Sequence, residues 1–135
     1  MDNIELIELA KKAREKAFVP MSHFKVGAAL LTKEGKVFLG CNIEDPSGVG
    51  ALNVCAERCA VFKAISEGCM EFEKIACVGG IDELIFTTPC GVCRQLLNSY
   101  NHDMKVVCED KGEIREFSIQ ELLPYTFNET FGNKD

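Results

Sequence analysis

The sequence has neither a long apolar run nor an excess of basic residues, and both absences narrow its function. No stretch approaches the roughly 20 apolar residues that a membrane-spanning helix needs. Its 15 lysines and arginines are outnumbered by 21 aspartates and glutamates, and the basic residues are scattered along a chain of formal net charge -6. We therefore expect neither nucleic acid nor a membrane as a partner.

Signals for export and for several domains are also lacking. The opening residues, Met1 to Glu5, do not combine a basic segment with an apolar run, as a secretory signal does. We find no repeats, low-complexity segments or interdomain linker, and 135 residues with 47% apolar content suit a single core. We expect one domain over residues 1–135, a cytoplasmic location, and eight cysteines that serve as thiols or metal ligands rather than disulfides.

Local patterns predict nine elements. Residues 4–17 place their apolar side chains on one helical face, and Asn3 can cap the start of this helix. Residues 45–50 are dense in turn formers, and 79–88 are also expected to form a loop. The other predicted helices are 56–67, 91–100 and 120–123, and the predicted strands are 26–31, 37–42, 75–78, 106–108 and 114–117.

The order of these elements indicates the fold class. Strands alternate with helices in the middle of a short chain, which favours one mixed sheet covered on both faces. We predict an α/β fold, a three-layer α/β/α sandwich with one mixed five-stranded sheet.

Two cysteine motifs carry the chemistry of the sequence. Residues 55–58 read Cys-Ala-Glu-Arg and residues 89–93 read Pro-Cys-Gly-Val-Cys, each at the head of a predicted helix. Cys55, Cys90 and Cys93 supply the soft thiolate ligands that Zn²⁺ favours, and a three-ligand tetrahedral site leaves the fourth position open for water. Such an open position is what metal-assisted hydrolysis requires.

Arg58 is the candidate that balances the charge of this site. Three thiolates around Zn²⁺ leave one net negative charge, which would make bound water less acidic. Helix N-termini offset part of that charge and favour thiolates, and Arg58 can add hydrogen bonds to the sulfurs. We predict a supporting role for Arg58, with an ordinary surface position on the helix as the alternative.

Glu57 is the predicted acid/base residue. It follows Cys55 by two positions, too close along the helix start to be a comfortable fourth ligand but near enough to reach metal-bound water. In a deaminase, Glu57 would shuttle a proton from that water to the ring nitrogen, zinc-bound hydroxide would attack C4, and Glu57 would then protonate the departing amine. The alternative is a solvent-facing glutamate favoured by the helix dipole.

Two other sites fit the cysteines considered alone. A Cys-x-x-Cys pair suits a redox dithiol, and Cys55 and Cys59 with Cys90 and Cys93 suit a closed Cys₄ structural zinc site. The sequence has no aromatic-flanked motif after a first strand, which argues against the dithiol. A Cys₄ site would leave Glu57 without a role.

Together the motifs resemble those of the zinc-dependent cytidine deaminase family, specifically its short homotetrameric class. The resemblance covers nearly the whole chain and is carried by residues 20–30, 40–44, 55–68, 89–95 and 121–124. It implies Zn²⁺ as the cofactor, a small pyrimidine nucleoside as the substrate and a homotetrameric assembly.

The resemblance also assigns substrate contacts to three side chains. Phe24 is expected to pack against the pyrimidine ring, and Asn42 and Glu44 are expected to hydrogen-bond the ribose hydroxyls. These roles suit the residue types, because an aromatic face covers a flat ring and polar groups at a strand end can hold a diol. The alternatives are a core phenylalanine and a strand-end turn.

Backbone groups and the chain end complete the expected site. The Ala56 backbone N–H and the Thr88 carbonyl resemble the family's contacts to the base, and Phe127 corresponds to a phenylalanine that reaches a neighbouring subunit's site. The chain departs from the family pattern at Met21, where a tyrosine is usual, and at residues 45–52, a loop about two residues longer and without an aromatic residue.

These observations lead to one expected function and two alternatives. We expect zinc-dependent hydrolytic deamination of cytidine and deoxycytidine to uridine and deoxyuridine, as in pyrimidine salvage. The unusual loop keeps open a deaminase of a modified cytosine nucleoside, similar to the blasticidin S deaminases. From another class, a non-catalytic zinc-stabilised binding module fits if water cannot reach the metal.

Overall fold

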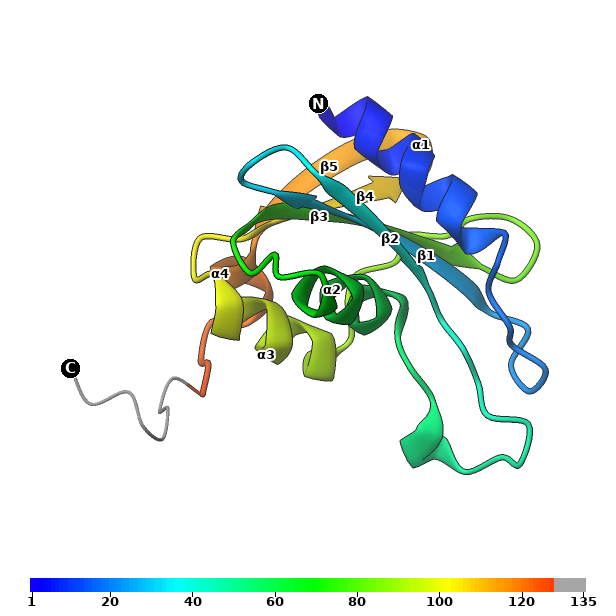
Figure 1. Cartoon of the computed structure of the whole chain (residues 1–135). Helices are drawn as coiled ribbons and strands as arrows, with labels where there is room; N and C mark the ends of the chain where they lie inside the picture. The colour runs from blue at the N-terminus through cyan, green and yellow to red at the C-terminus, as the bar shows by residue number, and fades with distance from the viewer. Residues whose placement is uncertain (128–135) are drawn as a thin grey trace.

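The computed structural model describes residues 1–127, which form nine main helices and strands and one short 3₁₀ helix (Figure 1). Among these described residues, no helix has the length and apolar character needed to cross a membrane. The elements are α1 (Asn3–Arg14), β1 (Lys25–Thr32), β2 (Val37–Cys41), η1 (Gly50–Leu52), α2 (Ala56–Ser66), β3 (Phe72–Gly80), α3 (Gly91–Tyr100), β4 (Lys105–Asp110), β5 (Glu113–Ser118) and α4 (Ile119–Leu122).

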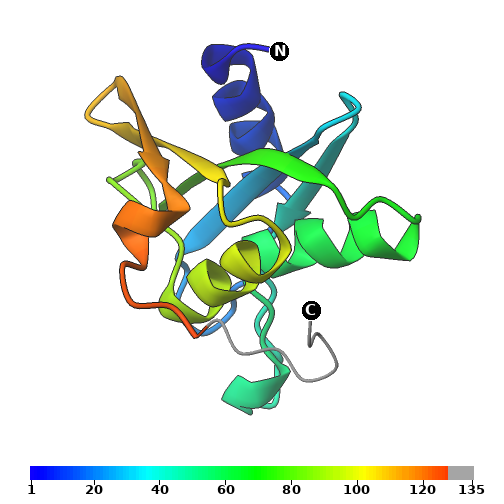
Figure 2. The same cartoon turned by 90° about the vertical axis from the view of Figure 1, so that its left-hand side faces the viewer.

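The five strands form one mixed sheet in the order β2-β1-β3-β4-β5. Only the β3–β4 pair is parallel, and the other three neighbouring pairs are antiparallel. Helix α1 covers one face, while α2, α3 and α4 lie on the other (Figures 1 and 2). The predicted three-layer α/β/α sandwich with a five-stranded mixed sheet is confirmed.

Two buried clusters fill the space on either side of the sheet. One joins α1 to the sheet and includes Leu6, Ile7 and Ala10. The larger one joins α2, α3 and α4 to the opposite face through residues such as Ala60, Leu97 and Ile119. Each central strand contributes side chains to both clusters, because successive residues of a strand point to opposite faces of the sheet.

Helices approach the sheet closely where strands carry glycine. A Cβ added to Gly27 would lie 2.0 Å from the Ala10 carbonyl oxygen, and one added to Gly40 would lie 2.3 Å from the Ala56 carbonyl oxygen. Real side chains do not tolerate such distances, so these glycines set how near α1 and α2 lie to the strands. The Gly40 contact fixes the start of α2, where the Cys-Ala-Glu-Arg motif begins.

The structure differs from the sequence predictions at several boundaries. Helix α1 ends at Arg14 rather than residue 17, and Asp2 rather than Asn3 caps it through a hydrogen bond from the Glu5 backbone N–H. Asp2 is the cap because it forms a capping box with Glu5, and this box satisfies two backbone donors at the helix start. Strand β3 is longer than predicted because β1 pairs with nearly all of it.

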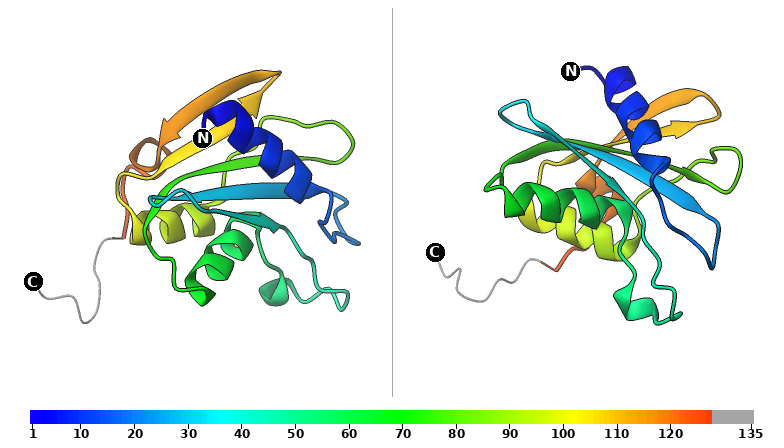
Figure 3. Two further views of the ribbon diagram at one scale, coloured as in Figure 1. Left: turned by 45° about the horizontal axis from the view of Figure 1, so that its top comes forward. Right: turned by 45° about the vertical axis from the view of Figure 1, so that its right-hand side comes forward.

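Residues 43–54 form a projecting arm rather than a simple loop (Figures 1 and 3). The backbones of Ile43 and Val54 exchange two hydrogen bonds of 2.9 Å, which join the two legs of the arm. The 3₁₀ helix η1, which the sequence analysis did not predict, lies near its tip. The arm returns the chain to Cys55 at the start of α2.

Candidate metal centre and active site

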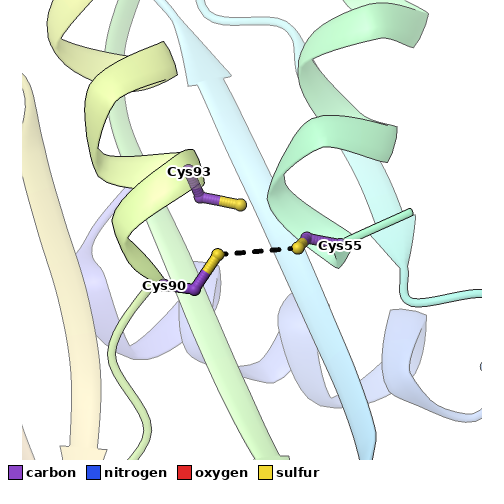
Figure 4. A group of neighbouring side chains, drawn as sticks. All are labelled: Cys55, Cys90 and Cys93. Atoms are coloured by element: carbon purple, nitrogen blue, oxygen red, sulfur yellow. Dashed lines mark hydrogen bonds between the residues drawn. The ribbon is translucent and has the colours of Figure 1, made fainter. Parts of the chain in front are cut away.

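Helices α2 and α3 begin beside each other on the same face of the sheet, and both beginnings carry cysteine (Figures 1 and 4). Cys55 is the N-cap residue of α2, Cys90 is the N-cap residue of α3, and Cys93 lies in the first turn of α3. The two motifs, far apart in the sequence, therefore meet at two positive helix ends. Such ends stabilise thiolates.

The three sulfurs have the spacing of a zinc site. The Sγ atoms of Cys55, Cys90 and Cys93 all lie within 4.8 Å of one another, and Cys55 Sγ is 3.7 Å from Cys90 Sγ (Figure 4). Zn–S bonds of about 2.3 Å at tetrahedral angles place sulfurs roughly 3.8 Å apart. The residues present thus fit one Zn²⁺ ion held by three cysteines.

Hydrogen bonds among these side chains shift the pKa values of Cys55 and Cys93 in opposite directions. A hydrogen bond from Cys93 lowers the pKa of the Cys55 thiol to about 5, with further bonds from Arg58 and Cys90 acting against burial. The pKa of Cys93 is raised, first by its hydrogen bond with Cys55 and then by burial. These opposite shifts favour negative charge on Cys55 over Cys93.

Arg58 lies where a supporting role requires it. Its Nη2 group lies 3.8 Å from Cys55 Sγ and donates to the Asn53 carbonyl oxygen at 3.0 Å. The second contact anchors the guanidinium to the end of the arm, and the first brings positive charge to a ligand sulfur. The role predicted for Arg58 is compatible with this placement and stays a prediction.

Glu57 points into the protein beside the cysteines. Its side chain is only 3% exposed, and its Oε1 lies 3.9 Å from Cys93 Sγ. Burial raises the pKa of the Glu57 carboxyl to about 7, because removing water penalises the charged form. A carboxyl with that pKa can hold or release a proton near neutral pH, which an acid/base residue must do. A solvent-facing position is excluded.

A cavity of about 190 Å³ opens beside Glu57 and the cysteines. It contains Phe24, Ala56 and Thr88, three of the residues expected to contact a base. Ala56 is the first residue of α2, so its N–H is free of the helix's own hydrogen bonds. The lining residues are Phe24, Val26, Asn42, Cys55, Ala56, Glu57, Thr87, Thr88 and Cys90.

Val26 and Thr87 line the cavity but were missed by the sequence analysis. Thr87 precedes the predicted contact Thr88, and its hydroxyl donates to the Ile85 carbonyl oxygen at 3.0 Å. Val26 lies on β1, two residues after Phe24, which directly precedes the strand, and both residues line the cavity. That two-residue spacing was the available signal for Val26, while nothing in the local sequence distinguished Thr87.

Asn42 and Glu44 hold the segment that carries Phe24. Asn42 Nδ2 donates to the Phe24 carbonyl oxygen, and Asn42 Oδ1 accepts from the Val26 N–H, both at 2.8 Å. Glu44 Oε1 accepts from the backbone N–H groups of Met21 and Ser22, at 2.8 and 3.1 Å. Only Asn42 lines the cavity, so the expected ribose contacts of both residues stay predictions.

Two further predicted positions lie away from this cavity. Cys59 lines a different cavity together with Cys41 and is not part of the described three-cysteine group, so the closed Cys₄ arrangement is not formed. Phe127 is 63% exposed and does not line the cavity of its own chain. Its expected contact with a neighbouring subunit stays a prediction.

A protein-family model and several known proteins match most of the chain. The family model of the cytidine and deoxycytidylate deaminase zinc-binding region matches residues 1–109. The chain belongs to this deaminase family. It is 43% identical over 130 residues to a cytidine deaminase of Sporosarcina psychrophila, covering 95% of this chain and 93% of that protein. It is 46% identical over 129 residues to one of Halalkalibacterium halodurans, covering 94% and 95%.

Solved deaminase structures share the fold. The crystal structure of cytidine deaminase from Burkholderia pseudomallei matches with a TM-score of 0.85 and 45% identity, covering 94% of this chain and 100% of that chain. A more distant relative is the blasticidin-S deaminase of Bacillus cereus, 34% identical over 134 residues, covering 93% of this chain and 94% of that protein. The chain is thus more similar to these cytidine deaminases than to this blasticidin-S deaminase.

Proposed function

We propose that the protein catalyses the hydrolysis of cytidine and deoxycytidine to uridine and deoxyuridine with release of ammonia. The observation that carries the proposal is the buried Glu57 carboxyl, which lies beside the three-cysteine group and lines one cavity with Cys55 and Cys90. The relatives named cytidine deaminase, 43 and 46% identical over nearly the full length, support the substrate class. A homotetramer and a cytoplasmic location complete the proposal, on the family resemblance.

Cys55, Cys90 and Cys93 would hold the zinc ion. When bound, the ion acts as a Lewis acid that lowers the pKa of water at its open position. The neighbouring starts of α2 and α3 hold these sulfurs close together, with 3.7 Å between Cys55 Sγ and Cys90 Sγ. Arg58 adds positive charge next to Cys55 Sγ.

Glu57 moves the protons of the reaction. Its carboxylate takes a proton from the attacking water and delivers it to the ring nitrogen, which makes C4 of the base more electrophilic. After the hydroxide has added to C4, Glu57 takes the proton of the new C4 hydroxyl and passes it to the amine, the C4–N bond breaks, ammonia leaves, and the C4 oxygen becomes the carbonyl of the product. The pKa of about 7 suits both directions of transfer at neutral pH.

The cavity walls orient the base. Phe24 provides an apolar face for the flat ring, the Ala56 N–H donates to the base carbonyl, and the Thr88 carbonyl accepts from the amine. All three residues line one cavity.

An ammonia-release assay tests this proposal directly. The zinc-loaded protein should deaminate cytidine and deoxycytidine, while Glu57→Gln should keep its zinc and lose about 10²–10⁴-fold in kcat. Glu67→Gln, at the exposed C-terminal end of α2, is the matched control and should retain full turnover. Zinc-loaded wild-type protein that releases ammonia from neither nucleoside would refute the proposal, and a lack of turnover with blasticidin S as well would favour a zinc-stabilised binding module.

The second candidate function is deamination of a modified cytosine nucleoside such as blasticidin S. It is favoured by one observation, the arm of residues 43–54, which carries the exposed apolar side chains Val49 and Leu52 in place of an aromatic residue. The same assay decides, because a kcat/KM for blasticidin S above that for cytidine would replace the first proposal with the second.

A further inference from the structure

Arg94 forms hydrogen bonds to two separate segments of the chain, residues 88–89 and Leu122. It lies one residue beyond Cys93 in α3, and its Nε and Nη2 groups donate to the Pro89 carbonyl oxygen at 2.7 Å and to the Thr88 hydroxyl at 2.8 Å. Its Nη1 group donates to the Leu122 carbonyl oxygen at 2.6 Å. The guanidinium thus connects the rim of the base cavity with the last residue of α4.

The three acceptors of Arg94 carry no formal charge. Two are backbone carbonyls and one is a hydroxyl, so these contacts fix positions without neutralising the charge. A guanidinium presents its donors in one rigid plane, and three acceptors from two segments are therefore held in one mutual geometry. A lysine ammonium, a single point of charge, cannot reproduce that geometry.

Gln95, the next residue of α3, holds the chain beyond α4. Its Nε2 group donates to the Phe127 carbonyl oxygen at 2.9 Å, and its Oε1 accepts from the Phe127 N–H at 3.2 Å. One side-chain amide therefore satisfies both backbone groups of one residue. Successive residues of the cysteine-bearing helix thus secure both the beginning and the end of residues 122–127.

We propose that Arg94 and Gln95 are positioning residues that set the Thr88 rim of the base cavity and the residue 122–127 segment as one unit. The inference rests on the proposed function, because it assigns the Thr88 rim to base binding. Neither side chain contacts Glu57 or a ligand sulfur in the described hydrogen bonds. Their loss therefore weakens substrate binding more than the chemical step, whereas a residue needed only for stability would not separate KM from kcat.

The first experiment compares Arg94→Lys with the control Arg115→Lys. Arg115 lies on β5, where it stacks on Phe86 and Phe117 and does not line the cavity. We expect Arg94→Lys to raise KM for cytidine about tenfold, as loss of charged hydrogen bonds predicts, with kcat within about threefold and zinc content unchanged. The control should leave KM and kcat unchanged. An unchanged KM in Arg94→Lys, or a loss of activity that parallels loss of zinc, would overturn the proposal.

Amide hydrogen exchange supplies a readout that does not depend on turnover. Arg94→Lys should speed exchange in both residues 86–90 and residues 119–127 of the zinc-loaded protein. Gln95→Met, similar in size but without the amide, should speed exchange only in the second segment, and Gln95→Glu, which keeps one acceptor, should fall between wild type and Gln95→Met. Exchange that is unchanged in residues 119–127 of these variants would refute the link. Failure of wild-type turnover alone would refute the proposed function and leave this result standing.

Discussion

Ser22 shows how a side chain outside the cavity can control one that lines it. Its hydroxyl and backbone N–H hydrogen-bond Glu44, and these bonds lower the pKa of the Glu44 carboxyl. The same hydroxyl accepts from the Phe24 backbone N–H at 3.1 Å. Glu44, Ser22 and the position of Phe24 are therefore linked, and this link can be measured by titration.

We expect Ser22→Ala to move the Glu44 pKa upward toward its ordinary value. The folded carboxylate is favoured by its partners, so Glu44 contributes stability above its unfolded pKa, and that contribution is lost as pH falls through the lowered folded pKa. The Ser22→Ala protein should lose it at a higher pH than wild type. Carboxyl carbon NMR titration of Glu44 measures the change, and an unaltered pKa would show that the backbone bonds alone set it.

Cys59 and Cys90 distinguish a three-cysteine site from a four-cysteine site. Cys59 lies in another cavity beside Cys41, whereas Cys90 Sγ is 3.7 Å from Cys55 Sγ. We expect Cys59→Ala to retain one zinc per chain after dialysis against a chelator and Cys90→Ala to lose it, since an open site cannot spare one of three ligands. Atomic emission of the dialysed proteins gives the metal content. Loss of zinc from Cys59→Ala would restore the closed Cys₄ interpretation.

Among the secondary structure elements, α2 depends on a strand residue for its position. Gly40 of β2 lies under the first turn of α2, where an added Cβ would come 2.3 Å from the Ala56 carbonyl oxygen and 2.5 Å from the Ala60 nitrogen. These are backbone atoms, so the helix itself must move to make room. Cys55 and Glu57 flank Ala56 and would move with it.

We therefore expect Gly40→Ala to lower the free energy of unfolding by at least about 2 kcal/mol and to weaken zinc binding. Gly50→Ala is the matched control, because nothing lies within 4 Å of a Cβ added there. Urea unfolding gives the first quantity and chelator competition the second. A Gly40→Ala protein that loses stability but binds zinc as tightly as wild type would show that the strand does not position the site.

The element order and the grouping of three cysteines that could hold a metal could be predicted from the sequence, because both depend on local signals. Helix starts at Cys55 and Cys90 follow from short motifs, and thiolates at such ends have a physical reason to bind metal. The engagement of Asn42 and Glu44 with backbone groups of residues 21–26 could not be predicted, because it depends on how β1, β2 and the preceding segment meet. The joining of the arm's legs at Ile43 and Val54 depends on similar long-range pairing.

The described chain leaves apolar side chains uncovered near its end, which bears on the assembly. Phe127 is 63% exposed, Tyr125 is 95% exposed, and Gln95 holds the Phe127 backbone. Within the part of the chain that the structure describes, these two rings are exposed to water. In the proposed homotetramer, Phe127 would instead contribute to the site of a neighbouring subunit, so each site would combine Glu57 of one chain with Phe127 of another.

This division of the site predicts complementation between two defective chains. Glu57→Gln removes the proton carrier but leaves Phe127 intact, while Phe127→Ala does the reverse. When the two variants are coexpressed with different tags and the mixed assemblies are isolated, some sites regain both groups. We expect kcat/KM for cytidine to exceed the mean of the two parent assemblies, because in the proposed homotetramer Phe127 of one chain would reach the site of another. Activity equal to that mean would place Phe127 and Glu57 in the same chain's site, or Phe127 outside it.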